Sequence, residues 1–122
     1  MSDPGPTARL LRPFVPARDF ALSRRFYADL GFEEGFSNDE LAVFSLGATS
    51  FYLQNYCWDG VDQHYMLTLV VDDVEAWWPK VREVAARYGV RVREPKDEVW
   101  GAREIHLIDP TGGLWHIAQF GT

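Results

Sequence analysis

Glu104, His106 and His116 are the residues whose types and spacing could support chemistry. Glu104 and His106 are two positions apart, so on a strand both side chains point to the same face. The stretch 109–113, Asp-Pro-Thr-Gly-Gly, predicts a tight turn before His116. A hairpin register could bring His106 and His116 opposite each other, within reach of one metal ion. Either histidine could instead act as a general base, contact a ligand, or be a hydrogen-bonded core residue.

Cap and turn signals divide the chain into two similar halves. In each half an aspartate can cap a helix, Asp19 or Asp73, and a glycine can end it, Gly31 or Gly89. The first half is predicted to contain a strand over 10–15 that Pro13 interrupts, a helix over 20–30, and strands over 32–37, 41–46 and 49–56. After a loop over 57–63, the second half is predicted to contain a strand over 64–71, a helix over 74–88 that Pro79 kinks or delays, strands over 90–94, 102–108 and 114–120, and a loop over 95–101.

The repeated order of strand, helix and three strands predicts an α+β fold built from two βαβββ modules. We expect the modules, about 9–56 and 64–120, to form a curved mixed sheet around a concave groove. The chain 1–122 is expected to be a single domain, with a flexible Pro- and Gly-rich tail over 1–7.

Alternation along the strands separates two faces of the sheet. The apolar face should pack against the helices, and it comprises Leu11, Val15, Phe51, Leu53, Leu67, Leu69, Val71, Ile105, Leu107, Trp115 and Ile117. The other face mixes aromatic and polar groups, and it comprises Arg12, Phe14, Tyr52, Gln54, Tyr56, Met66, Thr68, Glu104, His106 and His116. A mixed face is typical of a ligand pocket, where a few polar groups orient a molecule between apolar walls. The alternative is a face that packs only on a second subunit.

Composition excludes several classes of partner. The formal net charge of −6 argues against a nucleic-acid-binding face and against an anionic membrane surface. The single cysteine, Cys57, cannot form an internal disulfide, which fits a reducing compartment. With no signal-peptide pattern and no apolar run long enough to span a membrane, the protein is expected to be cytoplasmic.

Four motifs in order resemble the vicinal oxygen chelate superfamily, which includes glyoxalase I, extradiol dioxygenases, fosfomycin resistance enzymes and bleomycin resistance proteins. They are Arg18-Asp19 followed by Ser23-Arg24-Arg25-Phe26-Tyr27, then Leu30-Gly31-Phe32, Asp72-Asp73-Val74 and Asp109-Pro110-Thr111-Gly112. The resemblance extends from about Leu10 to Phe120. It implies the doubled βαβββ fold and a homodimer.

The resemblance also implies where a metal would be bound. Metal-dependent relatives carry His, Gln or Glu on the first strand of each module and on the last strand, positions that match Arg12, Met66 and His116 here. A guanidinium and a thioether are poor ligands for a hard or borderline divalent ion. The family's metal site is therefore expected to be absent, with no cofactor, and lyase or dioxygenase chemistry is not expected.

The stretch 99–104, Val-Trp-Gly-Ala-Arg-Glu, resembles the bleomycin-resistance branch, with Ala102 as an extra residue. This resemblance implies a metal-free protein that binds a small aromatic or cationic molecule, such as an antibiotic, in a groove of a dimer. The groove is expected to be lined by Arg12, Phe14, Tyr52, Gln54, Tyr56, Trp58, Met66, Trp100, Glu104, His106 and His116. The alternative is a lyase or dioxygenase with a relocated metal site at Glu104, His106 and His116.

Overall fold

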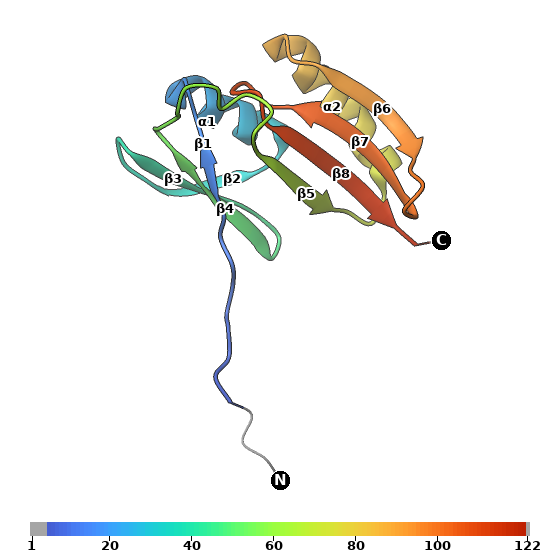
Figure 1. Ribbon diagram of the computed structural model, residues 1–122, viewed down its shortest axis with the longest axis horizontal. Helices are drawn as coiled ribbons and strands as arrows, with labels where there is room; N and C mark the ends of the chain where they lie inside the picture. The colour runs from blue at the N-terminus through green and yellow to red at the C-terminus, as the bar shows by residue number, and fades with distance from the viewer. Residues whose placement is uncertain (1–4, 122) are drawn as a thin grey trace.

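The computed structural model describes residues 5–121, which form two βαβββ modules placed side by side (Figure 1). The first module consists of β1 Phe14–Pro16, α1 Phe20–Leu30, β2 Glu33–Ser37, β3 Leu41–Leu46 and β4 Thr49–Gln54. The second consists of β5 Met66–Val70, α2 Val74–Tyr88, β6 Val92–Asp97, β7 Ala102–Ile108 and β8 Leu114–Phe120. The predicted α+β class and the repeat are confirmed.

Each module forms its own four-stranded sheet, in the orders β1-β4-β3-β2 and β5-β8-β7-β6. Both sheets are mixed, because β1 pairs with β4 and β5 pairs with β8 in parallel, while the remaining pairs are antiparallel. The strands of the two modules therefore make two separate sheets and not one continuous sheet. The same topology in both modules places β8 at the position that β4 occupies in the first.

The two helices begin and end where the sequence indicated. The Asp19 carboxylate accepts a hydrogen bond from the Leu22 amide, and the Asp73 carboxylate accepts from the amides of Glu75 and Ala76. Gly89 closes α2 with φ 66°, a left-handed conformation that favours glycine. Helix α2 runs through Pro79, whose ring nitrogen cannot donate to the preceding turn. Neither helix within residues 5–121 is long and apolar enough to cross a membrane.

The core lies between the helices and the sheets and joins the two modules. Tyr27 of α1 is completely buried, and its ring contacts Phe51 of β4 and Trp115 of β8 at centroid distances of 5.0 and 5.4 Å. Aromatic contacts of this kind add to the stabilisation from burial itself. Trp115 is thus a core residue, as predicted, and it links the last strand to the first module.

Two predicted strands are displaced from the observed ones, and those predicted over 32–37, 49–56 and 64–71 are one to three residues too long. The first strand was predicted over 10–15, but β1 begins only at Phe14, after Pro13, whose missing N–H group cannot join a ladder. Leu11, predicted on the buried face, is consequently 88% exposed. The strand predicted over 90–94 is displaced to 92–97, because a bulge between Arg93 and Lys96 takes Pro95 into β6 instead of the loop.

Gly113, in the turn between β7 and β8, is predicted to tolerate no side chain. A Cβ atom placed there would lie 1.9 Å from the ring of Tyr65, and the Tyr65 hydroxyl is itself anchored to Asp109. We expect Gly113→Ala to lower the free energy of unfolding by about 1–3 kcal/mol, measured by urea denaturation. Gly35→Ala is the matched control, since the nearest atom to its added Cβ is 3.9 Å away. Equal losses in both variants would contradict the prediction.

Candidate functional site

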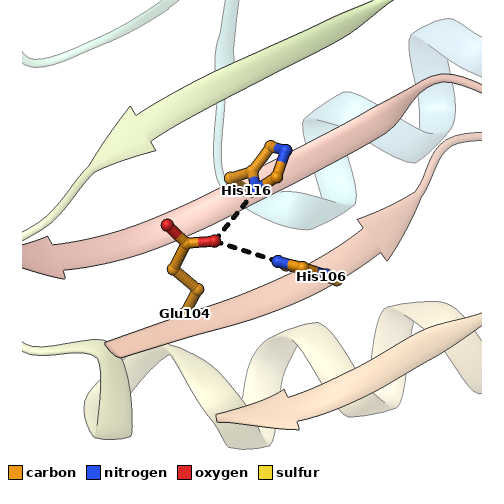
Figure 2. Close-up of side chains that lie close together, drawn as sticks. All are labelled: Glu104, His106 and His116. Atoms are coloured by element: carbon orange, nitrogen blue, oxygen red, sulfur yellow. Dashed lines mark hydrogen bonds and ion pairs between the residues drawn. The ribbon is translucent and has the colours of Figure 1, made fainter. Parts of the chain in front are cut away.

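Strands β7 and β8 bring Glu104, His106 and His116 together on the face opposite the helices (Figure 2). His106 and His116 are direct partners in the antiparallel register, and their rings lie 4.6 Å apart between centroids. Glu104 is two residues before His106 and therefore shares its face. The predicted hairpin register is confirmed.

The turn that aligns the two strands is built around the buried Asp109. Its carboxylate accepts hydrogen bonds from the amides of Thr111, Gly112 and Gly113, at 2.9–3.0 Å. It also accepts from two tyrosine hydroxyls and one indole, which belong to Tyr27, Tyr65 and Trp115. Burial beside this carboxylate raises the pKa of both tyrosines, so they remain donors at neutral pH. The turn geometry, and with it the register of the histidines, depends on this network.

Glu104 is the centre of the cluster, and only 2% of it is exposed. Its Oε1 accepts from His106 Nε2 and from His116 Nδ1, each at 2.9 Å. Its Oε2 accepts from the indole N–H of Trp100 at 2.9 Å. Trp100 belongs to the tight connection between β6 and β7 and lies over the carboxylate. Three N–H donors therefore converge on one buried carboxylate.

These donors keep Glu104 ionised. Burial by itself would raise the pKa of this carboxyl, but the hydrogen bonds from His116, Trp100 and His106 outweigh it and lower the pKa to about 2. An ionised carboxylate can only accept, so each histidine directs an N–H group toward it. In the neutral histidines this leaves Nδ1 of His106 and Nε2 of His116 as acceptors.

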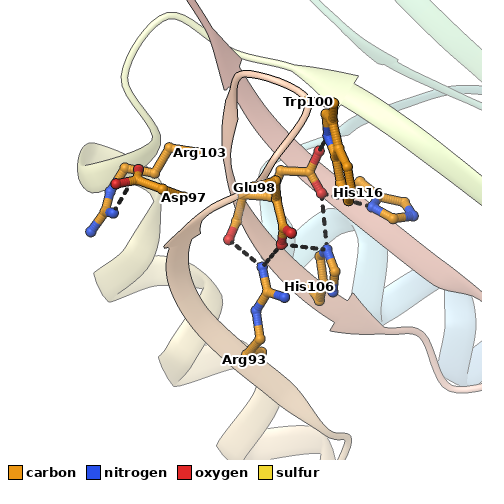
Figure 3. A network of polar contacts seen from close by, with 8 residues as sticks. Arg93, Asp97, Glu98, Trp100, Arg103, His106 and His116 are labelled. Atoms are coloured by element: carbon orange, nitrogen blue, oxygen red, sulfur yellow. Dashed lines mark hydrogen bonds and ion pairs between the residues drawn. The ribbon is translucent and has the colours of Figure 1, made fainter.

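A second carboxylate, Glu98, lies next to the cluster (Figure 3). Its Oε1 is 3.8 Å from His106 Nε2 and 2.7 Å from a guanidinium nitrogen of Arg93. Arg93 also donates to the backbone carbonyl of Glu104 at 3.0 Å. Glu98 and Arg93 were missed from the sequence, because they lie around a bulge and a connection where no periodic pattern marks a face.

The first sheet carries a separate group of predicted residues. The Arg12 guanidinium donates to Ser50 Oγ at 2.9 Å and to the Tyr52 hydroxyl at 3.2 Å. It also lies over the Tyr52 ring, which stacks on Phe14 at 4.8 Å between centroids. Arg12 precedes β1 and is not part of it. The residue at one of the family's metal positions is thus already engaged as a hydrogen-bond donor.

The remaining predicted residues lie around these two groups. Gln54 is the last residue of β4, and Tyr56 and Trp58 follow in the loop, with ring centroids 6.4 Å apart. Met66 begins β5 and is 65% exposed. A shallow depression of about 260 Å³ opens beside His106, lined also by Arg91, Val92, Arg93, Ile108 and Leu114. The structure thus gathers the predicted residues into two groups, one on each sheet.

The arrangement has two chemical capabilities. The three ligand atoms offered by Glu104, His106 and His116 lie within 4.8 Å of one another, a set of donors that suits a borderline divalent ion. The exposed aromatic rings of Phe14, Tyr56 and Trp100 offer flat surfaces on which a ligand ring could stack.

Comparison with known proteins agrees with this architecture. A bleomycin resistance protein from Klebsiella pneumoniae is 26% identical over 115 residues, which are 88% of this chain and 89% of that protein. The crystal structure of a bleomycin-binding protein complexed with bleomycin matches with a TM-score of 0.80 and 24% identity, over 93% of this chain and 100% of that one.

The fold is shared more widely. A lactoylglutathione lyase from Agrobacterium tumefaciens matches with a TM-score of 0.68 and 18% identity, over 94% of this chain and 95% of that one. A family model described as the glyoxalase/bleomycin resistance protein/dioxygenase superfamily matches residues 9–117, which is nearly the whole chain. The resemblance to this superfamily and to its bleomycin-resistance branch is confirmed, and the chain belongs to the glyoxalase/bleomycin resistance protein/dioxygenase superfamily.

Proposed function

We propose that this protein binds and sequesters a small aromatic or cationic molecule, without chemistry, in a groove between two copies of the chain. The observation that carries the proposal is the aromatic surface left open on the sheets. Phe14, Tyr56 and Trp100 are each more than half exposed. Aromatic side chains are enriched where proteins bind partners and ligands.

A dimer would explain why the predicted residues fall into two groups. The Arg12–Tyr52–Phe14 group belongs to the first sheet, whereas the Glu104 cluster with Trp100 belongs to the second. In this arrangement each group would form one wall of a groove. Two copies related by a two-fold axis would each contribute both walls, and would create two equivalent grooves.

The chemistry of the walls indicates what the ligand must offer. Flat rings would stack on Trp100, Tyr52 or Tyr56. Donor groups would bond to the free ring nitrogens of His106 and His116, because Glu104 itself is covered by its three donors. A positive charge on the ligand is favoured by the net charge of −6. Bleomycin, which the similar crystal structure contains, is the first probe to use.

Quenching of tryptophan fluorescence by bleomycin and by a panel of other aromatic cations tests the proposal. We expect saturable quenching at micromolar ligand, and a loss of affinity of about 10-fold or more in Trp100→Phe, which removes the indole N–H and part of the stacking surface. Trp78→Phe on α2 is the matched control and should bind normally. Absence of quenching by every member of the panel, or equal losses in both variants, would overturn the proposal.

The dimer is tested separately by sedimentation. We expect a mass about twice the chain mass of 14.0 kDa, both with and without ligand. A single species at the chain mass under both conditions would exclude a groove built from two copies.

A further inference from the structure

We propose that Glu104, His106 and His116 bind a borderline divalent cation of the Zn²⁺ type. This site shares His116 with the family's usual metal positions, but the other two of those positions hold Arg12 and Met66, and Glu104 and His106 lie outside them. It goes beyond ligand sequestration, since the ion would be bound by the protein alone. The three side chains converge from neighbouring strands toward one point on the face opposite the helices (Figure 2).

The donor set and its spacing fit such an ion. One carboxylate oxygen and two imidazole nitrogens are ligands that Zn²⁺ takes in proteins, at about 2.0–2.2 Å from the ion, so that neighbouring ligands of a tetrahedral site are about 3.4 Å apart. Here Glu104 Oε1 is 2.9 Å from a nitrogen of each histidine, and all three atoms lie within 4.8 Å of one another. Side-chain shifts of up to about one ångström would bring the three atoms to this spacing and admit the ion.

Surrounding groups already hold the ligands in position. The Trp100 indole donates to Glu104 Oε2, which leaves Oε1 directed at the two histidines. Partners that orient a ligating carboxylate in this way increase metal affinity. The strand pairing between β7 and β8 fixes the two imidazoles relative to each other. The site is therefore largely formed before an ion binds.

The local charge also favours a cation. Glu104 and Glu98 bring two carboxylates, whereas Arg93 is the one cation in contact with them among the described residues (Figure 3). Glu98 Oε1 is buried, pairs with the Arg93 guanidinium at 2.7 Å and lies 3.8 Å from His106 Nε2. A divalent ion beside it would offset the remaining negative charge.

Binding exchanges hydrogen bonds for metal bonds without changing the number of protons. In each neutral histidine the proton now directed at Glu104 moves to the other ring nitrogen through solvent, and the vacated lone pair takes the ion. The Glu104 carboxylate stays ionised throughout. No oxidation or reduction is involved.

Metal titration of protein purified without an affinity tag and treated with a chelator tests the site. We expect one Co²⁺ per chain with the visible absorbance of tetrahedral coordination, and displacement of Co²⁺ by Zn²⁺ measured by calorimetry. His106→Gln and His116→Gln should each weaken binding by about 100-fold or more, and Trp100→Phe by about 10-fold. His64→Gln is the matched control, because His64 is exposed and outside the cluster.

Two results would overturn the proposal. One is the absence of a Co²⁺ spectrum and of Zn²⁺ heat at micromolar metal in folded wild-type protein. The other is equal weakening by His64→Gln and His116→Gln, which would indicate binding at exposed histidines. Circular dichroism of each variant establishes that it is folded. The titration contains no organic ligand, so its failure leaves the sequestration proposal standing.

Discussion

Replacing Asp109 by alanine is expected to lower the free energy of unfolding by about 3–5 kcal/mol. The carboxylate is 2% exposed and accepts hydrogen bonds from three backbone amides, two tyrosine hydroxyls and the Trp115 indole. Its removal leaves these donors buried without an acceptor, and each such donor costs free energy. Because the donors come from both modules, the loss should extend beyond the turn.

Urea denaturation followed by tryptophan fluorescence measures this loss. Asp62→Ala is the matched control, because Asp62 is more than half exposed and its one ion pair within residues 5–121 is with the exposed Arg18. Exposed ion pairs contribute about 0–1 kcal/mol, so the control should remain nearly as stable as wild type. A loss in Asp109→Ala no larger than in Asp62→Ala would show that the turn does not depend on the carboxylate.

Glu104 is expected to make the protein sensitive to acid. Its pKa is about 2 in the folded protein against an ordinary value of 4.5, so the unfolded state binds a proton first as pH falls. The corresponding stabilisation, about 3 kcal/mol, is complete above the unfolded value and is lost as pH falls toward the folded one. In Glu104→Gln it is absent. The stability difference between wild type and this variant should therefore shrink by about 2 kcal/mol between pH 6 and pH 3.

The difference is obtained from urea denaturation curves at several pH values. Glu94→Gln on β6 is the matched control, since Glu94 is exposed and its replacement should leave the acid response unchanged. A constant difference between wild type and Glu104→Gln across this range would rule out the ionised, triply bonded carboxylate. Both predictions concern the same hairpin, which Asp109 anchors at its turn and Glu104 at the opposite end.

Much of this protein could be predicted from local patterns in the sequence. The helices follow from Asp19, Asp73 and Gly89, because caps act through bonds to neighbours in the chain. The hairpin that pairs His106 with His116 follows from the turn at 109–113 and from the alternation of the strands on either side. The repeat of one βαβββ unit could be predicted from the order of these elements alone.

Other features depend on contacts between residues that are distant in the chain, and only the tertiary structure decided them. The start of β1 after Pro13 and the exposure of Leu11 reflect which backbone groups find a partner on β4. The separation into two sheets depends on pairing between strands, which periodicity within a strand does not encode.

The same distinction applies to the candidate site. The sequence by itself determined that Glu104, His106 and His116 share one face, because strand alternation and a tight turn are local properties. Only the tertiary structure decided that Trp100 covers Glu104, that Glu98 and Arg93 lie beside His106, and that Arg12 is bonded to Tyr52. Those contacts join a bulge, a connection and two strands, and their energies depend on burial that no local pattern specifies.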